Sequence, residues 1–130
     1  MIPILNVEEN ICLPLALDGR EIDIERLDEL IKVLGLEDRR KHLPNELSGG
    51  QQQRTSIGRS MITNPTIILA DEPTGNLDSK SSEEIVNLLK KSNKDYKQTI
   101  IMITHNMEIA TAAERIIKIE DGKIVSQNVR

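Results

Sequence analysis

Apolar residues change their spacing along the chain, and this change divides it into two halves. Before about residue 63, apolar positions recur at helical intervals, with charged residues on the opposite face. In the clearest stretch these positions are Ile24, Leu27, Leu30, Ile31 and Leu34. Gly35 follows that stretch as a helix C-cap. The pattern predicts a helical subdomain over 1–63 and a region of alternating strands and helices over 64–130.

Three apolar runs of the second half have the length of β-strands. They cover residues 66–70, 98–104 and 115–120. Helices are expected between them, at 80–91 and 106–113. Short apolar runs separated by helices are typical of a parallel sheet covered on both faces. Asp121-Gly122 is a turn signal before a last short strand, so we expect a terminal hairpin and an α/β fold.

Two adjacent glycines stand where a helix should begin. Ser48 is a good N-cap for a helix that ends before Asn64-Pro65, but Gly49 and Gly50 occupy its first turn. A glycine inside a helix costs about 1 kcal/mol relative to alanine. Bare amides at a helix N-terminus form an anion cradle, so we predict that this segment contacts a phosphate.

Composition narrows the function classes. The chain has 130 residues and a net charge of −4, with scattered basic residues, which argues against a nucleic-acid-binding surface. Tyr96 is the only aromatic residue, so single-stranded bases have no stacking platform. Cys12 stands alone among apolar neighbours, which fits a reducing compartment and a packing role. No apolar run reaches the roughly 18 residues that span a bilayer, and the N-terminus does not resemble a secretion signal, so we expect a cytosolic chain.

Acidic and polar residues follow two of the predicted strands. Asp71 and Glu72 end the first strand, and Thr104 and His105 end the second. Parallel strands bring their carboxyl ends to one edge of the sheet, where ligands bind. Two adjacent carboxylates call for a cation or a proton, although a solvated acidic turn explains them equally well. A lone histidine after a strand is usually structural, but this placement favours a role beside the acidic pair.

Together the segments LSGGQQQR, ILADEPTGNLD and ITHN, in that order, resemble the nucleotide-binding subunits of ATP-binding-cassette (ABC) transporters. LSGGQ is similar to the family's signature motif, ILADE to its Walker B strand, GNLD to its D-loop and THN to its histidine switch. The wording of NVEENICLPLAL and ADEPTGNLDS resembles most the lipoprotein-release, macrolide-exporter and antimicrobial-peptide-resistance branch. The resemblance covers nearly the whole chain and implies a P-loop NTPase-like ABC ATPase fold.

The resemblance implies a head-to-tail dimer that sandwiches two ATP molecules. A second ATP-binding subunit would hold the γ-phosphate that this chain contacts in trans. The contacting residues would be Ser48, Gly49, Gly50 and Gln51. On this view the two glycines belong to a phosphate cradle.

The same resemblance assigns roles around the acidic pair. Asp71 would hold Mg²⁺, directly or through water, and Glu72 would activate the attacking water. His105 would contact the γ-phosphate, and Asp78 in the D-loop would communicate across the dimer. Positioning and charge neutralisation are the main work of phosphoryl transfer, which suits this set of groups.

The sequence departs from the family pattern in small ways. Asn106 follows His105 where aspartate is common, and TSIGRS replaces an alanine-rich stretch after the signature. Gly58 and Ser60 are still small, so close helix packing is expected there.

One motif of the family is absent from the sequence. No glycine stands in the pattern G-x-x-x-x-G-K-[ST] of the phosphate loop, and the adenine-stacking aromatic and the Q-loop glutamine are also lacking. We interpret the chain as the carboxyl-terminal portion of a longer ATPase, and we expect the isolated 130-residue chain to be inactive. The related fold has a strand between those matching 98–104 and 115–120. Without it two apolar edges are unpaired, which predicts a dimer, a domain-swapped assembly or a rearranged sheet. These edges carry Ile100, Ile101, Ile116 and Ile117.

The favoured function is an ATP-hydrolysing subunit that powers export, or extraction from the membrane, of a substrate chosen by a permease. The helical half, residues 7–60, would dock on that permease at the cytoplasmic face of the cell membrane. The alternative is a non-catalytic module that only docks or dimerises. A DNA-repair or chromosome-structuring relative would need coiled-coil heptads or a basic surface, and the sequence has neither.

Overall fold

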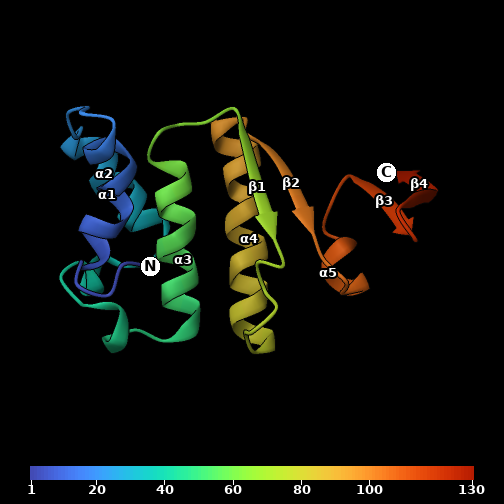
Figure 1. The fold of residues 1–130 in the computed structure, drawn as a ribbon, viewed down its shortest axis with the longest axis horizontal. Coiled ribbons are helices and arrows are strands. Elements are labelled where there is room, and N and C mark those ends of the chain that lie inside the picture. Colours follow the sequence, from blue (N-terminus) through green and yellow to red (C-terminus); the bar gives the residue numbers. More distant parts are fainter.

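The computed structural model describes all residues from Met1 to Arg130. Helices and strands follow one another along the chain as Figure 1 shows. In order they are α1 (Val7–Leu17), α2 (Ile24–Val33), the short 3-10 helices η1 (Glu37–Arg39) and η2 (Pro44–Glu46), α3 (Gly49–Met61), β1 (Ile67–Asp71), α4 (Ser79–Tyr96), β2 (Thr99–Ile103), α5 (Met107–Ala110), β3 (Arg115–Glu120) and β4 (Lys123–Val129). The α/β class predicted from the sequence is confirmed.

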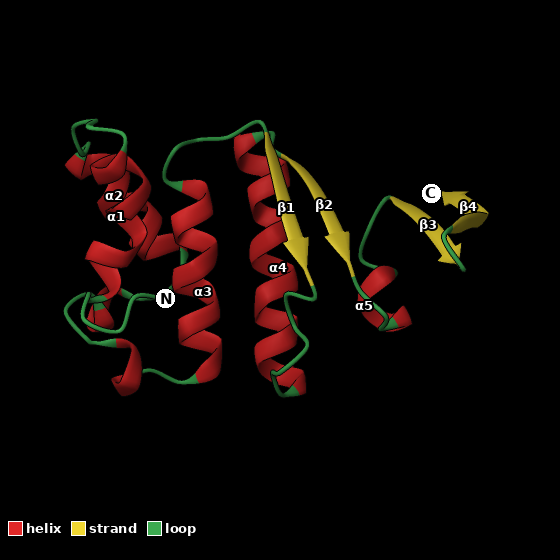
Figure 2. Cartoon of the chain, viewed as in Figure 1, coloured by secondary structure: helices red, strands yellow, loops and turns green.

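The elements form successive layers. Helices α1, α2 and α3 pack together, α4 lies beside α3, and strands β1 and β2 lie against α4 (Figures 1 and 2). β1 and β2 pair in parallel, with Ile67 opposite Thr99 and Asp71 opposite Ile103. α4 connects the two strands, as a parallel pair requires. This connection brings the carboxyl ends of both strands to one edge.

Side-chain caps begin the four long helices, and the cap predicted at Ser48 is confirmed. Asn6 and Ser48 each form a capping box, at α1 and at α3. Asp23 and Asp78 accept a first-turn N–H of α2 and α4. Gly35 has φ +64° after α2, which confirms its predicted place as a C-cap.

Buried apolar side chains gather in one cluster of 17 residues that runs from Val7 to Leu89. Cys12 belongs to it, as expected from its apolar neighbours. A Cβ atom at Gly58 would lie 2.5 Å from Leu34 Cδ1, so the predicted close helix packing at this glycine is confirmed. Because the cluster continues across residue 63, the two halves share one core.

The two-stranded sheet is covered on one face only. Ile68 is buried, and Ile100 and Met102 pack against the core on the α4 side. The opposite face is solvent-exposed: it carries Ile67, Leu69, Ile101 and Ile103. The expectation of a sheet covered on both faces is therefore wrong, because only one helical layer packs on these strands.

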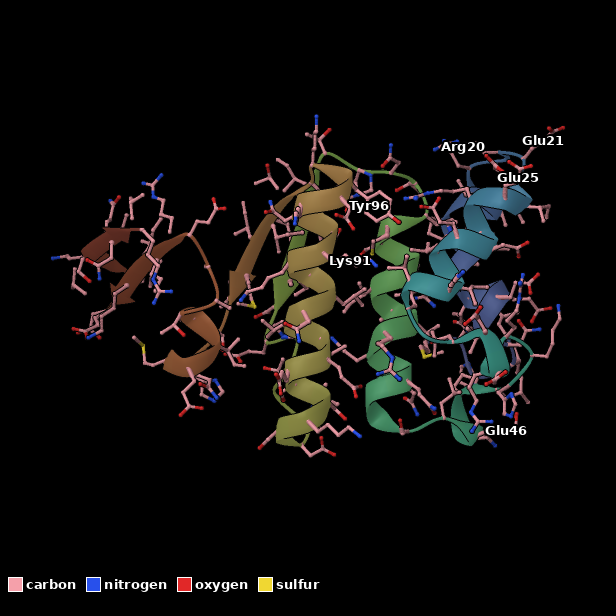
Figure 3. All side chains as sticks on the ribbon, turned by 180° about the vertical axis from the view of Figure 1, so that it is seen from behind. Arg20, Glu21, Glu25, Glu46, Lys91 and Tyr96 are labelled. Atoms are coloured by element: carbon pink, nitrogen blue, oxygen red, sulfur yellow. The ribbon has the colours of Figure 1, made fainter.

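Two helices differ in length from the prediction. α5 has four residues, and the chain continues through turns bonded from Ala112 to Ile109 and from Ala113 to Ala110. α4 extends to Tyr96 rather than ending near residue 91. Tyr96 lies on the side of α4 that faces the other helices (Figure 3), where its ring stacks on the Arg26 guanidinium at 4.6 Å. This tertiary contact stabilises the polar last turns of α4.

The strands form two separate sheets, the parallel pair β1–β2 and the antiparallel hairpin β3–β4. The hairpin turns at Asp121 and Gly122, both with positive φ, as the turn signal predicts. β2 and β3 each have an edge that pairs with no strand. The predicted unpaired edges are therefore present, with Ile101 and Ile117 about half exposed. The oligomeric state that they favour stays a prediction.

None of the helices combines the length and the apolar character that crossing a bilayer requires.

Candidate functional site

Glu72 and His105 meet where β1 and β2 end. The Nδ1 atom of His105 lies 2.8 Å from Glu72 Oε1, and the His105 main-chain N–H donates to the same oxygen at 2.9 Å. The Glu72 main-chain N–H donates to Ile103 O at 2.9 Å, which continues the strand pairing by one residue. Two residues that are 33 positions apart are thus brought together by the parallel strands, as the sequence predicts.

Glu72 has a backbone conformation that is rare for its residue type. Its φ of +44° lies in the left-handed region, which costs a non-glycine residue about 1–2 kcal/mol. The conformation turns the chain out of the strand and aims the carboxylate at His105. Such strain persists where the surroundings fix it, and it is concentrated at functional sites.

The loop that carries His105 is fixed by its own side chains. The Asn106 side-chain carbonyl accepts N–H groups of Glu108 and Ile109, and the Asn106 N–H donates to Thr104 Oγ1 at 3.1 Å. Asn106 therefore caps the single turn of α5. His105 is 84% exposed in its side chain, so its ring faces solvent except where it meets Glu72.

A groove of about 500 Å³ lies beside the Glu72–His105 pair. The loop after β1 and one face of α4 form one wall, and the loop around α5 forms the other. Its lining includes Thr74, Glu83, Asn87 and Lys90, which the sequence analysis does not single out. A signal for the three from α4 exists in the sequence: they recur at helical spacing on the polar face of the predicted helix.

Asp71 lies at the end of β1 and is exposed. No group of three or more His, Cys, Asp and Glu side chains gathers around one point in the structure. Mg²⁺ is commonly held by one or two carboxylates together with waters and substrate phosphates. A single accessible carboxylate beside Glu72 fits that mode of binding, with the remaining ligands coming from nucleotide and water.

The signature segment lies elsewhere, at the N-terminus of α3. Ser48 Oγ accepts the Gln51 N–H at 3.2 Å, and the Ser48 N–H donates to Gln51 Oε1 at 2.9 Å. Gly49 is exposed, whereas Gly50 is buried against Ser81 of α4. The first amides of a helix have no intrahelical partner, so the exposed end is suited to an anion. Packing on α4 gives Gly50 a second reason to be glycine.

Asp78 lies next to this segment rather than in the groove. It caps α4 and accepts the Ser81 N–H at 2.7 Å. Hydrogen bonds from the Ser81 backbone and side chain lower the pKa of the Asp78 carboxyl below its ordinary value of 3.8. The structure therefore places the candidate residues in two groups: Glu72 and His105 with Asp71 beside them, and Asp78 with the start of α3.

Comparison with known proteins identifies the family. The family model described as "ABC transporter" matches residues 1–75, more than half of the chain. The macrolide export ATP-binding/permease protein MacB of Pasteurella multocida is 46% identical over an alignment of 130 positions that covers 98% of this chain and 20% of that protein. An uncharacterized ABC transporter ATP-binding protein of Methanocaldococcus jannaschii, MJ0796, is 47% identical over 95% of this chain and 55% of its own length.

Solved structures support the same family assignment. The dimeric structure of a post-hydrolysis state of the MJ0796 cassette, bound to ADP and Pi, superposes with a TM-score of 0.83 at 42% identity. The superposition covers 99% of this chain and 58% of the MJ0796 chain. This chain thus spans just over half the length of such cassettes and a smaller share of the MacB proteins. On sequence and on structure together, the chain belongs to the ABC transporter family, as part of an ATP-binding domain similar to those of MacB and MJ0796.

Proposed function

We propose that this chain is part of an ATP-hydrolysing subunit that powers the export of a substrate, or its extraction from a membrane. The observation that carries the proposal is the contact between Glu72 and His105 at the ends of the parallel strands. It supports a carboxylate that activates water and a histidine beside it, which are the roles that the family resemblance suggests for these residues.

The two oxygens of the Glu72 carboxylate have different surroundings and would have different roles. Oε1 is bonded twice by His105, through the ring and through the main chain. The other oxygen has no such partner and can accept the proton of an attacking water. His105 holds the carboxylate in place, and its exposed ring is available to a phosphoryl oxygen. Mg²⁺ bound at Asp71 would neutralise phosphate charge when the nucleotide is present.

The signature segment would act on a nucleotide held by a second subunit. Ser48, Gly49, Gly50 and Gln51 are not among the residues that line the Glu72 groove, and we infer that one chain does not bring both groups to one phosphate. A head-to-tail dimer would bring the two groups together. The MJ0796 cassette, described as dimeric and bound to ADP and Pi, supports this arrangement.

A chimera tests the catalytic proposal. Residues 1–130 replace the matching part of the MJ0796 cassette, which supplies the rest of the ATPase domain. We expect MgATP turnover, and a loss of about 10²–10⁴-fold in Glu72→Gln, because a general base contributes that much. Glu83→Gln is the matched control, since Glu83 lines the same groove from α4. Unchanged turnover in Glu72→Gln would show that Glu72 is not the base.

A second candidate is a non-catalytic module. In this view the helical subdomain, residues 1–63, docks on a permease at the cytoplasmic face of the membrane, and the MacB relatives are named as combined ATP-binding and permease proteins. MgATP binding by the 130-residue chain alone is the first measurement. Tight binding would favour a complete site, and no binding would favour a shared one.

Association through the unpaired strand edges is part of the proposal. Ile101 of β2 and Ile117 of β3 are 50% and 44% exposed beside edges that pair with no strand. Exposed apolar edges recruit other strands, so we expect a dimer or a domain-swapped assembly. Sedimentation equilibrium should report it, and Ile101→Lys with Ile117→Lys should shift the chain to monomer. A monomeric parent chain would contradict this part.

A further inference from the structure

The first turns of α3 and α4 come close together at Gly50, where an added side chain would crowd Ser81. A Cβ atom at Gly50 would lie 3.0 Å from Ser81 Oγ and 3.2 Å from Ser81 Cβ. Favourable contacts between carbon atoms need about 3.5–4.0 Å. Gly50 is buried, so the space around it is taken up by protein. The glycine lets the two helix N-termini approach this closely.

Ser81 is held on its other side by Asp78. The Ser81 N–H donates to Asp78 Oδ1 at 2.7 Å. Because Ser81 belongs to the first turn of α4, its Cβ is fixed by helical backbone. It cannot withdraw from a new atom at Gly50 without loosening the cap. Ser81 therefore contacts Gly50 and Asp78 at the same time.

Neighbouring contacts keep the two helices at this distance. Arg54 and Glu84 form an ion pair one turn further along, and the Arg54 side chain is only 18% exposed. On the other side a Cβ atom at Gly49 would lie 3.4 Å from Leu77 Cδ2, an ordinary contact. Of the two glycines, Gly50 therefore has less free space beside α4 than Gly49 has.

We propose that Ser81 is a positioning residue that couples the Asp78 carboxylate to the Gly49–Gly50 amides within one chain. Displacement of Asp78 moves Ser81, which packs beside Gly50. The meaning of this coupling for ATP hydrolysis rests on the proposed function, in which both groups face the opposite subunit. The contact itself is independent of that function.

The first test asks whether the effect of Gly50→Ala on Tm changes sign when Ser81 is removed. Replacing glycine by alanine in a helix normally stabilises it. In the parent chain we expect Gly50→Ala to lower Tm, because the new Cβ collides with Ser81. In the Ser81→Gly background the same Gly50→Ala should leave Tm unchanged or raise it. Gly49→Ala is the matched control and should lower Tm in neither background.

The outcomes decide between coupling and independent sites. Equal Tm shifts for Gly50→Ala in both backgrounds would overturn the proposal, since contacting residues must be non-additive. Ser81→Ala serves as a second background should Ser81→Gly fold poorly: it removes Oγ but keeps Cβ, so it should relieve only part of the collision. If Gly50→Ala lowers Tm in the Ser81→Ala background by as much as in the parent chain, a contact through Oγ is also contradicted.

The second test follows the transmission directly, without nucleotide. Amide exchange and chemical shifts of Gly49 and Gly50 are measured by NMR in the full 130-residue chain. Asp78→Ala should change both amides in the parent and should change them much less when Ser81 is glycine. The same change in both backgrounds would overturn the coupling. Because neither test uses ATP, failure here is distinguishable from failure of the catalytic proposal.

Discussion

Helices α1 to α3 and the hairpin β3–β4 are both regular and hydrogen-bonded, but they differ in what their side chains bury. The helices supply most of the 17-residue apolar core. All seven residues of β4 are exposed, and in β3 only Ile116 is partly covered. Backbone pairing and exposed polar side-chain pairs therefore define the hairpin, whereas apolar packing stabilises the helices. An isolated two-stranded hairpin is only marginally stable in water, so we expect the two regions to respond differently to substitution.

The largest difference should come from removing apolar volume. Leu30 is fully buried, and Leu30→Ala should lower the free energy of unfolding by about 2–5 kcal/mol through lost burial and the cavity left behind. Ile119 in the hairpin is 63% exposed, and Ile119→Ala should change the same quantity by no more than about 0.5 kcal/mol. Urea unfolding followed by helical circular dichroism measures both. Equal effects would mean that the hairpin shares the core.

A buried polar network should give the next effect. Asn10 is fully buried; its side chain accepts the Ile2 N–H and donates to three carbonyls, and Arg59 bonds both its Oδ1 and its main-chain oxygen. Asn10→Ala leaves these groups unpaired and should cost about 1–3 kcal/mol in urea unfolding. Asn128→Ala in the exposed strand β4 is the control and should be close to neutral. A neutral Asn10→Ala would show that water replaces the side chain.

Two glycines with the same conformation provide a matched pair. Gly35 has φ +64° after α2 and Gly122 has φ +73° in the hairpin turn, and a Cβ atom would meet nothing within 4 Å at either. Alanine in the left-handed region costs about 1–2 kcal/mol. Gly35→Ala should lower the free energy of unfolding of the helices by that amount, and with it the urea midpoint. Gly122→Ala should instead accelerate amide exchange in β3 and β4 and leave the midpoint unchanged.

The smallest expected effect is electrostatic. Burial raises the pKa of Glu8, but hydrogen bonds from Lys41 and Arg40 together lower it by more. The pKa of Glu8 in the folded chain therefore lies below the ordinary 4.5. The ionised form is therefore favoured by folding. This contribution is present above pH 4.5 and is lost as the pH falls through the lowered value.

Glu8→Gln should accordingly reduce the fall in stability between pH 7 and pH 3 by roughly 0.5–1 kcal/mol, since the Glu8 side chain is 24% exposed and partly screened. Unfolding at the two pH values, in low and in high salt, measures it. Glu120→Gln in the hairpin is the comparison: its pair with Lys118 is 55% exposed on both sides, and it should have a smaller effect. A larger fall in stability for Glu8→Gln would contradict the sign.

The elements that sequence predicts well are those whose signals are local. Ser48, Gly35 and Asp121-Gly122 mark their helix ends and turn through short-range hydrogen bonds and φ preferences, and the structure places them as expected. The last turns of α4 are polar, and what favours them is the distant contact of Tyr96 with Arg26. The spacing of apolar residues along the sequence does not reveal such a contact.

In the candidate site, too, some features can be predicted from the sequence and others cannot. The meeting of Glu72 with His105 follows from parallel strand order, which apolar runs reveal. The positive φ of Glu72 has no counterpart in the pattern of residue types, because glutamate is not a residue that favours it. Nor does the sequence show that Gly50 faces Ser81, since glycine is equally expected for phosphate approach and for helix packing.

The left-handed backbone of Glu72 has a consequence for how this position can vary. A glycine there would relieve the strain and would stabilise the chain, yet it would remove the carboxylate. Selection for stability and selection for the proposed chemistry therefore pull position 72 in opposite directions. A variant library selected only for folding should enrich glycine at this position. A library selected for ATP turnover should keep glutamate and carry the destabilisation with it.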